Sequence, residues 1–198
     1  MLDEADHVRF VHDLFIFNDR NDVDPNHRFR EPHPAAHRVR LVDIHAYCLM
    51  PNHYHVLVSE VEDGGISLFM RKLNMGYAKY FNEKYERSGV LWQGTFKKIH
   101  MERDAHFLYI PYYIHLNPLD LTHPKWREGK ILNVEKAFKS LTQYRWSSFL
   151  DYNGVRNFPS VLNQDLLSDV LGSKIKQKSV IRDIISNFAL ASTSMVLE

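Results

Sequence analysis

The sequence is short of cysteine, of long apolar runs and of net charge, and each shortage excludes a class of protein. A single cysteine, Cys48, among 198 residues cannot form an internal disulfide and fits a reducing compartment. No apolar run approaches the roughly 20 residues that span a bilayer, so no membrane partner is expected. Residues 1–6 are acidic and unlike a signal peptide. We therefore expect a cytoplasmic protein.

The net charge of +1 hides an asymmetry along the chain. Residues 1–24 carry seven acidic and two basic side chains, whereas residues 69–103 carry eight basic and three acidic ones. A basic middle segment suits a polyanionic partner such as nucleic acid. A solvated helix face gives the same pattern, so charge alone does not decide between the two.

Hydrophobic periodicity and breaking residues predict alternating helices and strands. In chain order we expect a helix at 3–18 capped by Asp3, a long loop at 19–38, strands at 39–50 and 54–61, a helix at 66–85, a strand at 96–101, helices at 104–116 and 134–141, and one or two helices in the last 40 residues. This order predicts an α+β fold, with a small antiparallel sheet and helices on one face.

His53 and His55 flank one residue at the start of the second predicted strand. Because side chains alternate between the faces of a strand, both imidazoles should point the same way. Two imidazoles on one face are part of a divalent-metal site, or a pair of histidines satisfied by hydrogen bonds. The pattern alone leaves both interpretations open.

A third ligand and a nucleophile are available on the helix at 104–116 and just after it. Tyr113 and Asn117 are four residues apart and so share a face. An amide oxygen is a plausible hard ligand for Mg²⁺ or Mn²⁺, and a tyrosine beside a Lewis acid can act as a covalent nucleophile. Core packing is the alternative for the tyrosines of this helix.

Five stretches in order resemble the REP-associated tyrosine transposases, which belong with the single-tyrosine transposases of the HUH endonuclease superfamily. They are His45–Val58, Phe69–Asn74 with Tyr77–Asn82, Leu91–Lys97, Tyr113–Pro118 and Trp146–Phe149. The resemblance covers roughly residues 40–150. Five ordered motifs are far more specific than the histidine pair alone.

The resemblance implies a ferredoxin-like antiparallel sheet and a transposase that cleaves and rejoins single-stranded or hairpin DNA. It implies that His53, His55 and Asn117 bind a divalent metal, Mg²⁺ or Mn²⁺, and that Tyr113 attacks the DNA to give a 5′-phosphotyrosine. Phosphate contacts are expected from five basic residues: Arg71, Lys72, Lys79, Lys97 and Lys98. Relatives act as monomers or homodimers.

Two features depart from the family pattern. The strand that normally precedes the first helix is not found before residues 3–18, and the loop at 19–38 is longer than usual.

We expect a catalytic domain at 1–150 and a C-terminal helical extension at 151–198. A domesticated or truncated protein that binds DNA hairpins without cleaving them is the alternative, and a metal-dependent hydrolase that uses water is a third. Tyr109 with Tyr113 also matches the spacing of two-tyrosine enzymes, although packing is the expected role of Tyr109 and Tyr112.

Overall fold

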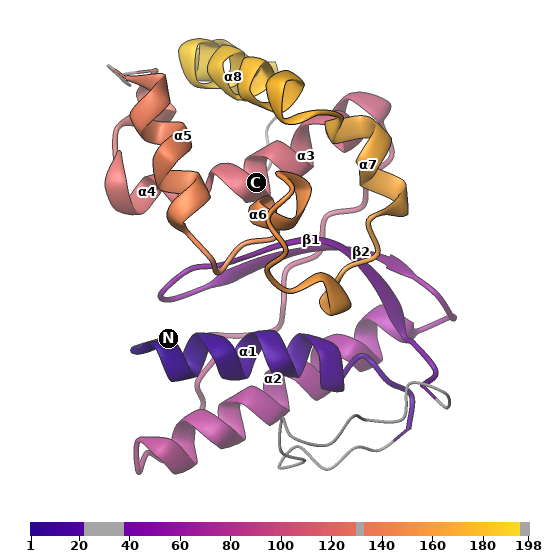
Figure 1. The fold of residues 1–198 in the computed structure, drawn as a ribbon. Helices are drawn as coiled ribbons and strands as arrows, with labels where there is room; N and C mark the ends of the chain where they lie inside the picture. Colours follow the sequence, from indigo (N-terminus) through magenta and orange to yellow (C-terminus); the bar gives the residue numbers. More distant parts are fainter. Residues whose placement is uncertain (22–37, 130–132, 195–198) are drawn as a thin grey trace. The chain divides into compact units, whose positions relative to one another are not determined.

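The computed structural model describes residues 1–21, 38–129 and 133–194. Most of the loop predicted at 19–38 therefore lies outside the described residues. The elements, labelled in Figure 1, are α1 (Glu4–Ile16), β1 (Val42–Leu49), β2 (Tyr54–Glu60), α2 (Gly65–Lys84), α3 (Asp104–Leu116), α4 (Leu119–Thr122), the 3-10 helix η2 (Trp126–Glu128), α5 (Val134–Gln143), α6 (Phe149–Tyr152), the 3-10 helix η3 (Pro159–Val161), α7 (Asp165–Leu171) and α8 (Lys174–Ser194).

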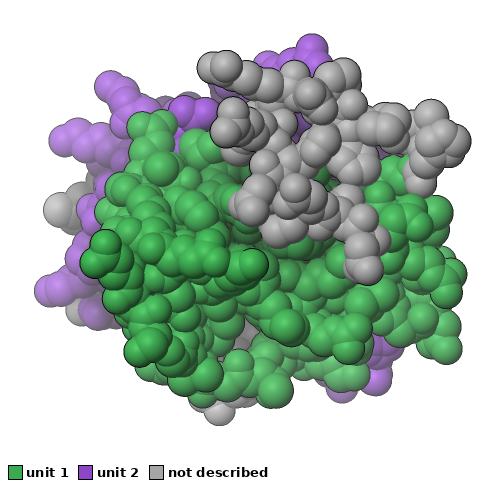
Figure 2. All heavy atoms as spheres, turned by 90° about the horizontal axis from the view of Figure 1, so that it is seen from below, with its two compact units in different colours: residues 1–44, 58–98 green, residues 45–57, 99–198 purple. Residues whose placement is uncertain are grey.

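The chain forms two compact units, shown in different colours in Figure 2. Unit 1 comprises residues 1–44 and 58–98, and unit 2 comprises residues 45–57 and 99–198. Strands β1 and β2 contribute residues to both units. The boundary predicted after residue 150 separates a catalytic domain from a C-terminal extension. That division concerns function, which the two structural units do not test, so it stays a prediction.

Unit 1 is built on α1 and α2, which lie side by side (Figure 1). Asp3 caps α1 as predicted: its carboxylate accepts from the Asp6 N–H at 2.9 Å, and the Asp6 carboxylate accepts from the Asp3 N–H in return. The buried faces meet through side chains at helical spacing, among them Phe10 and Leu14 of α1 and Phe69, Leu73, Tyr77 and Phe81 of α2. The amphipathic pattern of each helix thus determines which of its faces packs against the other helix.

The hairpin of β1 and β2 carries the histidine pair. The two strands form a two-stranded antiparallel sheet, closed where the Met50 N–H donates to the His53 carbonyl at 2.8 Å. The other side of β1 is occupied near its end, because Cys48 and Ser147 form an antiparallel bridge. The predicted strand at 96–101 is wrong: these residues form no regular element. Their alternation has no strand to pair with, since a strand exists only where its backbone groups find partners.

Unit 2 gathers α3 and the later helices around one apolar core. Its members include Trp126 of η2, Phe138 of α5, Leu167 of α7 and Ile181 of α8. Helix α5 and the two C-terminal helices, α7 and α8, confirm the sequence prediction, and Pro111 lies inside α3. The sequence analysis did not predict η2, which lies between the helices predicted at 104–116 and 134–141.

The described elements confirm the α+β class: a small antiparallel sheet with helices. Among the residues that the structure describes, no helix is both long and apolar enough to cross a membrane.

Candidate active site

The two histidines lie against each other in unit 2. The ring centroids of His53 and His55 are 5.0 Å apart, and the rings meet edge to face. His53 immediately precedes β2 and His55 is its second residue, so the alternation of the extended chain brings them to one side. Nδ1 of His53 is 2.8 Å from Oδ1 of Asn52. Because that oxygen only accepts, Nδ1 carries the proton and Nε2 of neutral His53 keeps its lone pair.

Both histidines are held neutral at neutral pH. Burial lowers the pKa of His55 to about 4, and the nearness of His53 and of the Arg127 guanidinium lowers it further, because a proton on His55 would be repelled by a proton on His53 or by the Arg127 charge. Burial also lowers the pKa of His53, with Asp120 opposing the shift and Arg127 adding to it. Neutral imidazoles are the form that binds metals.

Tyr113 of α3 lies next to His55. Their ring centroids are 5.8 Å apart, again edge to face. Tyr109, one turn earlier, lies 6.3 Å from the Tyr113 ring and is buried, whereas Tyr113 is half-buried. Tyr112 is also buried. The three aromatic residues therefore differ in access to solvent, and Tyr113 has the most.

Asn117 is buried and fixed by hydrogen bonds on both sides of its amide. Nδ2 donates to the Tyr113 carbonyl at 2.8 Å, and Oδ1 accepts from Nη2 of Arg127 at 3.0 Å. The guanidinium of Arg127 also donates to both carboxylate oxygens of Asp120, from Nε at 3.1 Å and from Nη2 at 2.9 Å. It lies 5.2 Å above the Tyr113 ring centroid. Arg127 thus links the predicted ligand Asn117 to the predicted nucleophile.

Two of the three predicted metal ligands, His53 and His55, lie together, and the third, Asn117, is tied to Tyr113 beside them. His53 and His55 are adjacent and neutral, and the Asn117 oxygen has two lone pairs, of which the bond from Arg127 uses one. Among the described residues, no group of three or more His, Cys, Asp or Glu side chains is arranged to hold a metal ion. A metal at this position would therefore depend on the amide or on water for its third ligand.

Sequence reasoning missed Asp120, Trp126 and Arg127. Trp126 is fully buried and its Nε1 donates to Asp120 at 2.6 Å, while Arg127 lies 4.5 Å over its ring. The signal available in the sequence was a tryptophan followed by an arginine in a stretch that otherwise reads as loop. That signal does not indicate which residues Trp126 and Arg127 will contact.

The basic residues predicted to contact DNA all belong to unit 1, and they differ in their surroundings. Arg71, Lys97 and Lys98 are exposed, whereas Lys79 lies 3.9 Å from Glu83. Lys72 is half-buried and its Nζ donates to the carbonyls of Asp19 and Asn21. These contacts give Lys72 a structural part in addition to any contact with DNA.

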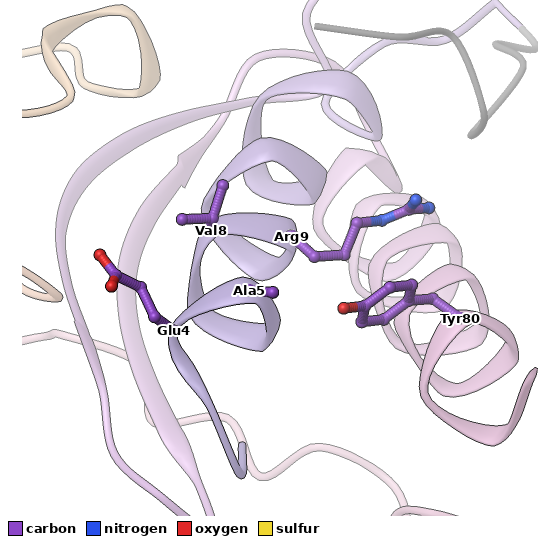
Figure 3. Close-up of a pocket in the computed structure, with 5 residues that line it drawn as sticks. All are labelled: Glu4, Ala5, Val8, Arg9 and Tyr80. Carbon is purple, nitrogen blue, oxygen red and sulfur yellow. The ribbon is translucent and has the colours of Figure 1, made fainter. Parts of the chain in front are cut away.

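A shallow hollow on unit 1 lies apart from the predicted residues. It is lined by Glu4, Ala5, Val8 and Arg9 of α1 and by Tyr80 of α2, which Figure 3 labels. Arg9 is bonded to Asp13 at 2.8 Å and lies 5.0 Å over the Tyr80 ring. No predicted catalytic, metal-binding or DNA-binding residue lines this hollow.

Comparison with known proteins identifies the class. The family model described as "Transposase IS200 like" matches residues 11–117, just over half of the chain. The chain therefore belongs to the IS200-like transposase family. Neither a search of curated proteins nor one of solved structures found a match. Family membership supports a transposase-like function, with DNA cleavage as its general activity, and confirms the resemblance carried by the motifs.

Proposed function

We propose that the protein is a metal-dependent single-strand DNA endonuclease and strand transferase that forms a 5′-phosphotyrosine through Tyr113. The observation that carries the proposal is the contact of Tyr113 with His55, which itself packs against His53. A tyrosine beside a neutral imidazole, with a second imidazole packed against the first, suits metal-assisted attack on a phosphodiester.

The chemical step is a transesterification. The Tyr113 hydroxyl gives its proton to solvent base, and its oxygen forms a bond to phosphorus while the bond from phosphorus to the 3′-oxygen breaks. The 3′-oxygen takes up a proton and leaves as a free hydroxyl. Because the phosphotyrosine keeps a phosphoester bond, the reverse attack by a 3′-hydroxyl rejoins the strand.

His53, His55 and Asn117 would hold the metal, Mg²⁺ or Mn²⁺. When bound, such an ion polarises a nonbridging phosphate oxygen. The protein's own residues orient the reaction: Asn117 is tied to the Tyr113 backbone, and Asn52 fixes the tautomer of His53. Arg71, Lys79, Lys97 and Lys98 would hold the strand through its phosphates. The substrate is single-stranded or hairpin DNA, and the active form is a monomer or homodimer.

The experiment uses a hairpin oligonucleotide with single-stranded flanks, labelled at either end, with Mn²⁺. The 3′-labelled fragment should become covalently attached to the protein, and the 5′-labelled fragment should be released with a hydroxyl that a polymerase can extend. Tyr113→Phe should abolish the adduct. Tyr109→Phe is the matched control, one turn away on the same helix, and should retain it. Cleavage that persists in Tyr113→Phe would show that water, not this tyrosine, is the nucleophile.

A protein that binds DNA hairpins without cleaving them is the second candidate. The observation in its favour is that the Asn117 oxygen already accepts a bond from Arg127. It predicts salt-sensitive hairpin binding with no adduct in Mg²⁺ or Mn²⁺.

A further inference from the structure

Arg127 lies ten residues beyond the last residue matched by the family model, yet it contacts the residues at the centre of the candidate site. It bonds Asn117 and lies over the ring of Tyr113.

The guanidinium is held in place before any substrate arrives. Asp120 takes its Nε and Nη2 edge with two bonds, and the Trp126 ring supports it at 4.5 Å. Asp120 is itself fixed by the Nε1 of buried Trp126 at 2.6 Å. A bidentate carboxylate and an aromatic face restrict a guanidinium to one plane and one orientation. Little side-chain entropy is then lost when Arg127 binds a further group.

The charge of Arg127 is permanent and reaches solvent. Burial lowers the pKa of the Arg127 guanidinium. Hydrogen bonds to Asp120, the negative charge of Asp120 and the nearness of Tyr113 outweigh burial, so this pKa is raised. About a third of the side chain, 32 %, is exposed. A cation that is fixed, accessible and 5.2 Å from the Tyr113 ring centroid lies close to the group that the Tyr113 hydroxyl attacks.

We infer that Arg127 binds the phosphate that Tyr113 attacks, and that it does so while also orienting Asn117. The inference rests on the proposed function for the identity of the attacked phosphate, whereas the contact with DNA phosphate stands independently of cleavage. Since Asp120 occupies the Nε and Nη2 edge, the phosphate contact uses the N–H groups of Nη1. A planar donor is needed at this position, so lysine should replace it only in part.

Binding is tested in the Tyr113→Phe background, in which no adduct can form. The affinity for a fluorescent hairpin oligonucleotide is measured in EDTA over a series of NaCl concentrations. Arg127→Ala should weaken binding and reduce the slope of log K against log salt by about one, as expected for the loss of one phosphate contact. Arg145→Ala is the matched control, because Arg145 is another arginine of unit 2 and is exposed, and its guanidinium lies 4.8 Å over the Trp146 ring. It should leave the slope unchanged.

Cleavage is tested with Tyr113 present and Mn²⁺ in excess. Arg127→Ala should lower the rate of adduct formation on the order of 10²-fold, as for removal of one preorganised donor from a transition state. Arg127→Lys should recover part of this rate, and added guanidinium should rescue Arg127→Ala. Arg127→Gln, which keeps a polar side chain towards Asn117, covers the case in which the alanine variant does not fold.

The outcomes separate the two proposals. A salt slope that is the same with and without Arg127 overturns the phosphate contact, whether or not the wild type forms an adduct. If Arg127→Ala lowers the melting temperature but leaves the salt slope unchanged, the role of Arg127 is only to stabilise the segment from Asn117 to Trp126. A reduced slope in a protein that forms no adduct would support the phosphate contact and contradict the proposed cleavage.

Discussion

At the scale of single residues, the candidate site depends on a buried hydrogen-bond network behind it. Oγ of Ser148 accepts from the Tyr47 N–H at 2.9 Å and lies 3.2 Å from the Tyr47 carbonyl, to which it donates. His115 of α3 reaches the same oxygen with Nε2 at 2.8 Å. Because the Ser148 proton is used, His115 must donate. Burial lowers the pKa of His115 to about 3, so the ring stays neutral.

Ser148→Ala should destabilise unit 2. The substitution leaves the Tyr47 N–H and the Nε2–H of His115 buried without this partner, which costs roughly 1–3 kcal/mol in the free energy of unfolding. Urea denaturation would measure the change. Ser168→Ala is the control, because Ser168 is exposed and bonds only to the Gln164 carbonyl of its own helix start. Equal stability of both variants would contradict the role given to Ser148.

At the scale of elements, α1 and α2 approach closely where α2 has a glycine. A Cβ at Gly76 would lie 2.2 Å from the ring of Phe17, the residue that follows α1. The glycine therefore permits contact between the two helices, although glycine in a helix interior is otherwise unfavourable.

Gly76→Ala should lower stability despite the better helix propensity of alanine. Overpacking against Phe17 is expected to cost about 1–3 kcal/mol, more than the gain of up to about 1 kcal/mol from propensity. Gly94→Ala is the matched control, since a Cβ there meets nothing within 4 Å. A melting temperature of Gly76→Ala equal to or above that of the wild type would show that α1 and α2 can move apart at this position without a loss of stability.

The same two elements are joined by an ionic cluster at their other ends. Nζ of Lys84 is 2.7 Å from carboxylate oxygens of both Asp3 and Asp6. Hydrogen bonding to Lys84, with the backbone bond at the cap, lowers the pKa of Asp3 to about 2. Burial raises the pKa of Asp6, but bonds from Lys84 and the Leu2 N–H outweigh it and lower this pKa as well.

Acid should weaken this junction between α1 and α2. A carboxyl whose pKa is lower in the folded chain stabilises the fold above the unfolded pKa, about 4, and this contribution is lost as the pH falls towards the folded value. For Asp3 the window is from about 4 down to about 2. Lys84→Met should flatten the dependence of the melting temperature on pH in this window. Lys79→Met, which removes only an exposed pair at 3.9 Å, should leave it as in wild type.

At the scale of the whole molecule, the basic residues of unit 1 are not equivalent. Arg71→Ala should reduce the salt dependence of hairpin binding without changing the melting temperature, because the side chain is exposed. Lys72→Ala should lower the melting temperature as well, because Nζ of Lys72 holds two backbone carbonyls at 2.6 and 2.8 Å. Binding and melting curves on the two variants would check this, and identical behaviour would show that the contacts of Lys72 do not matter.

The sequence by itself determined the elements whose signals are local. The cap at Asp3, the amphipathic stripe of α2 and the alternation at His53 and His55 depend on neighbours a few residues away, and each is found in the structure. Five ordered motifs determined the family for the same reason. Their residue types are read directly, without knowing where the chain turns.

Tertiary structure decided what depends on distant partners. The strand predicted at 96–101 does not form, because alternation is not enough without a neighbouring strand, and the Trp146–Ser148 segment bonds to β1 instead. The link from Arg127 to Asn117 and Tyr113 was equally hidden. It exists because buried Trp126 and the carboxylate of Asp120 turn the chain back on α3, a contact that no spacing in the sequence encodes.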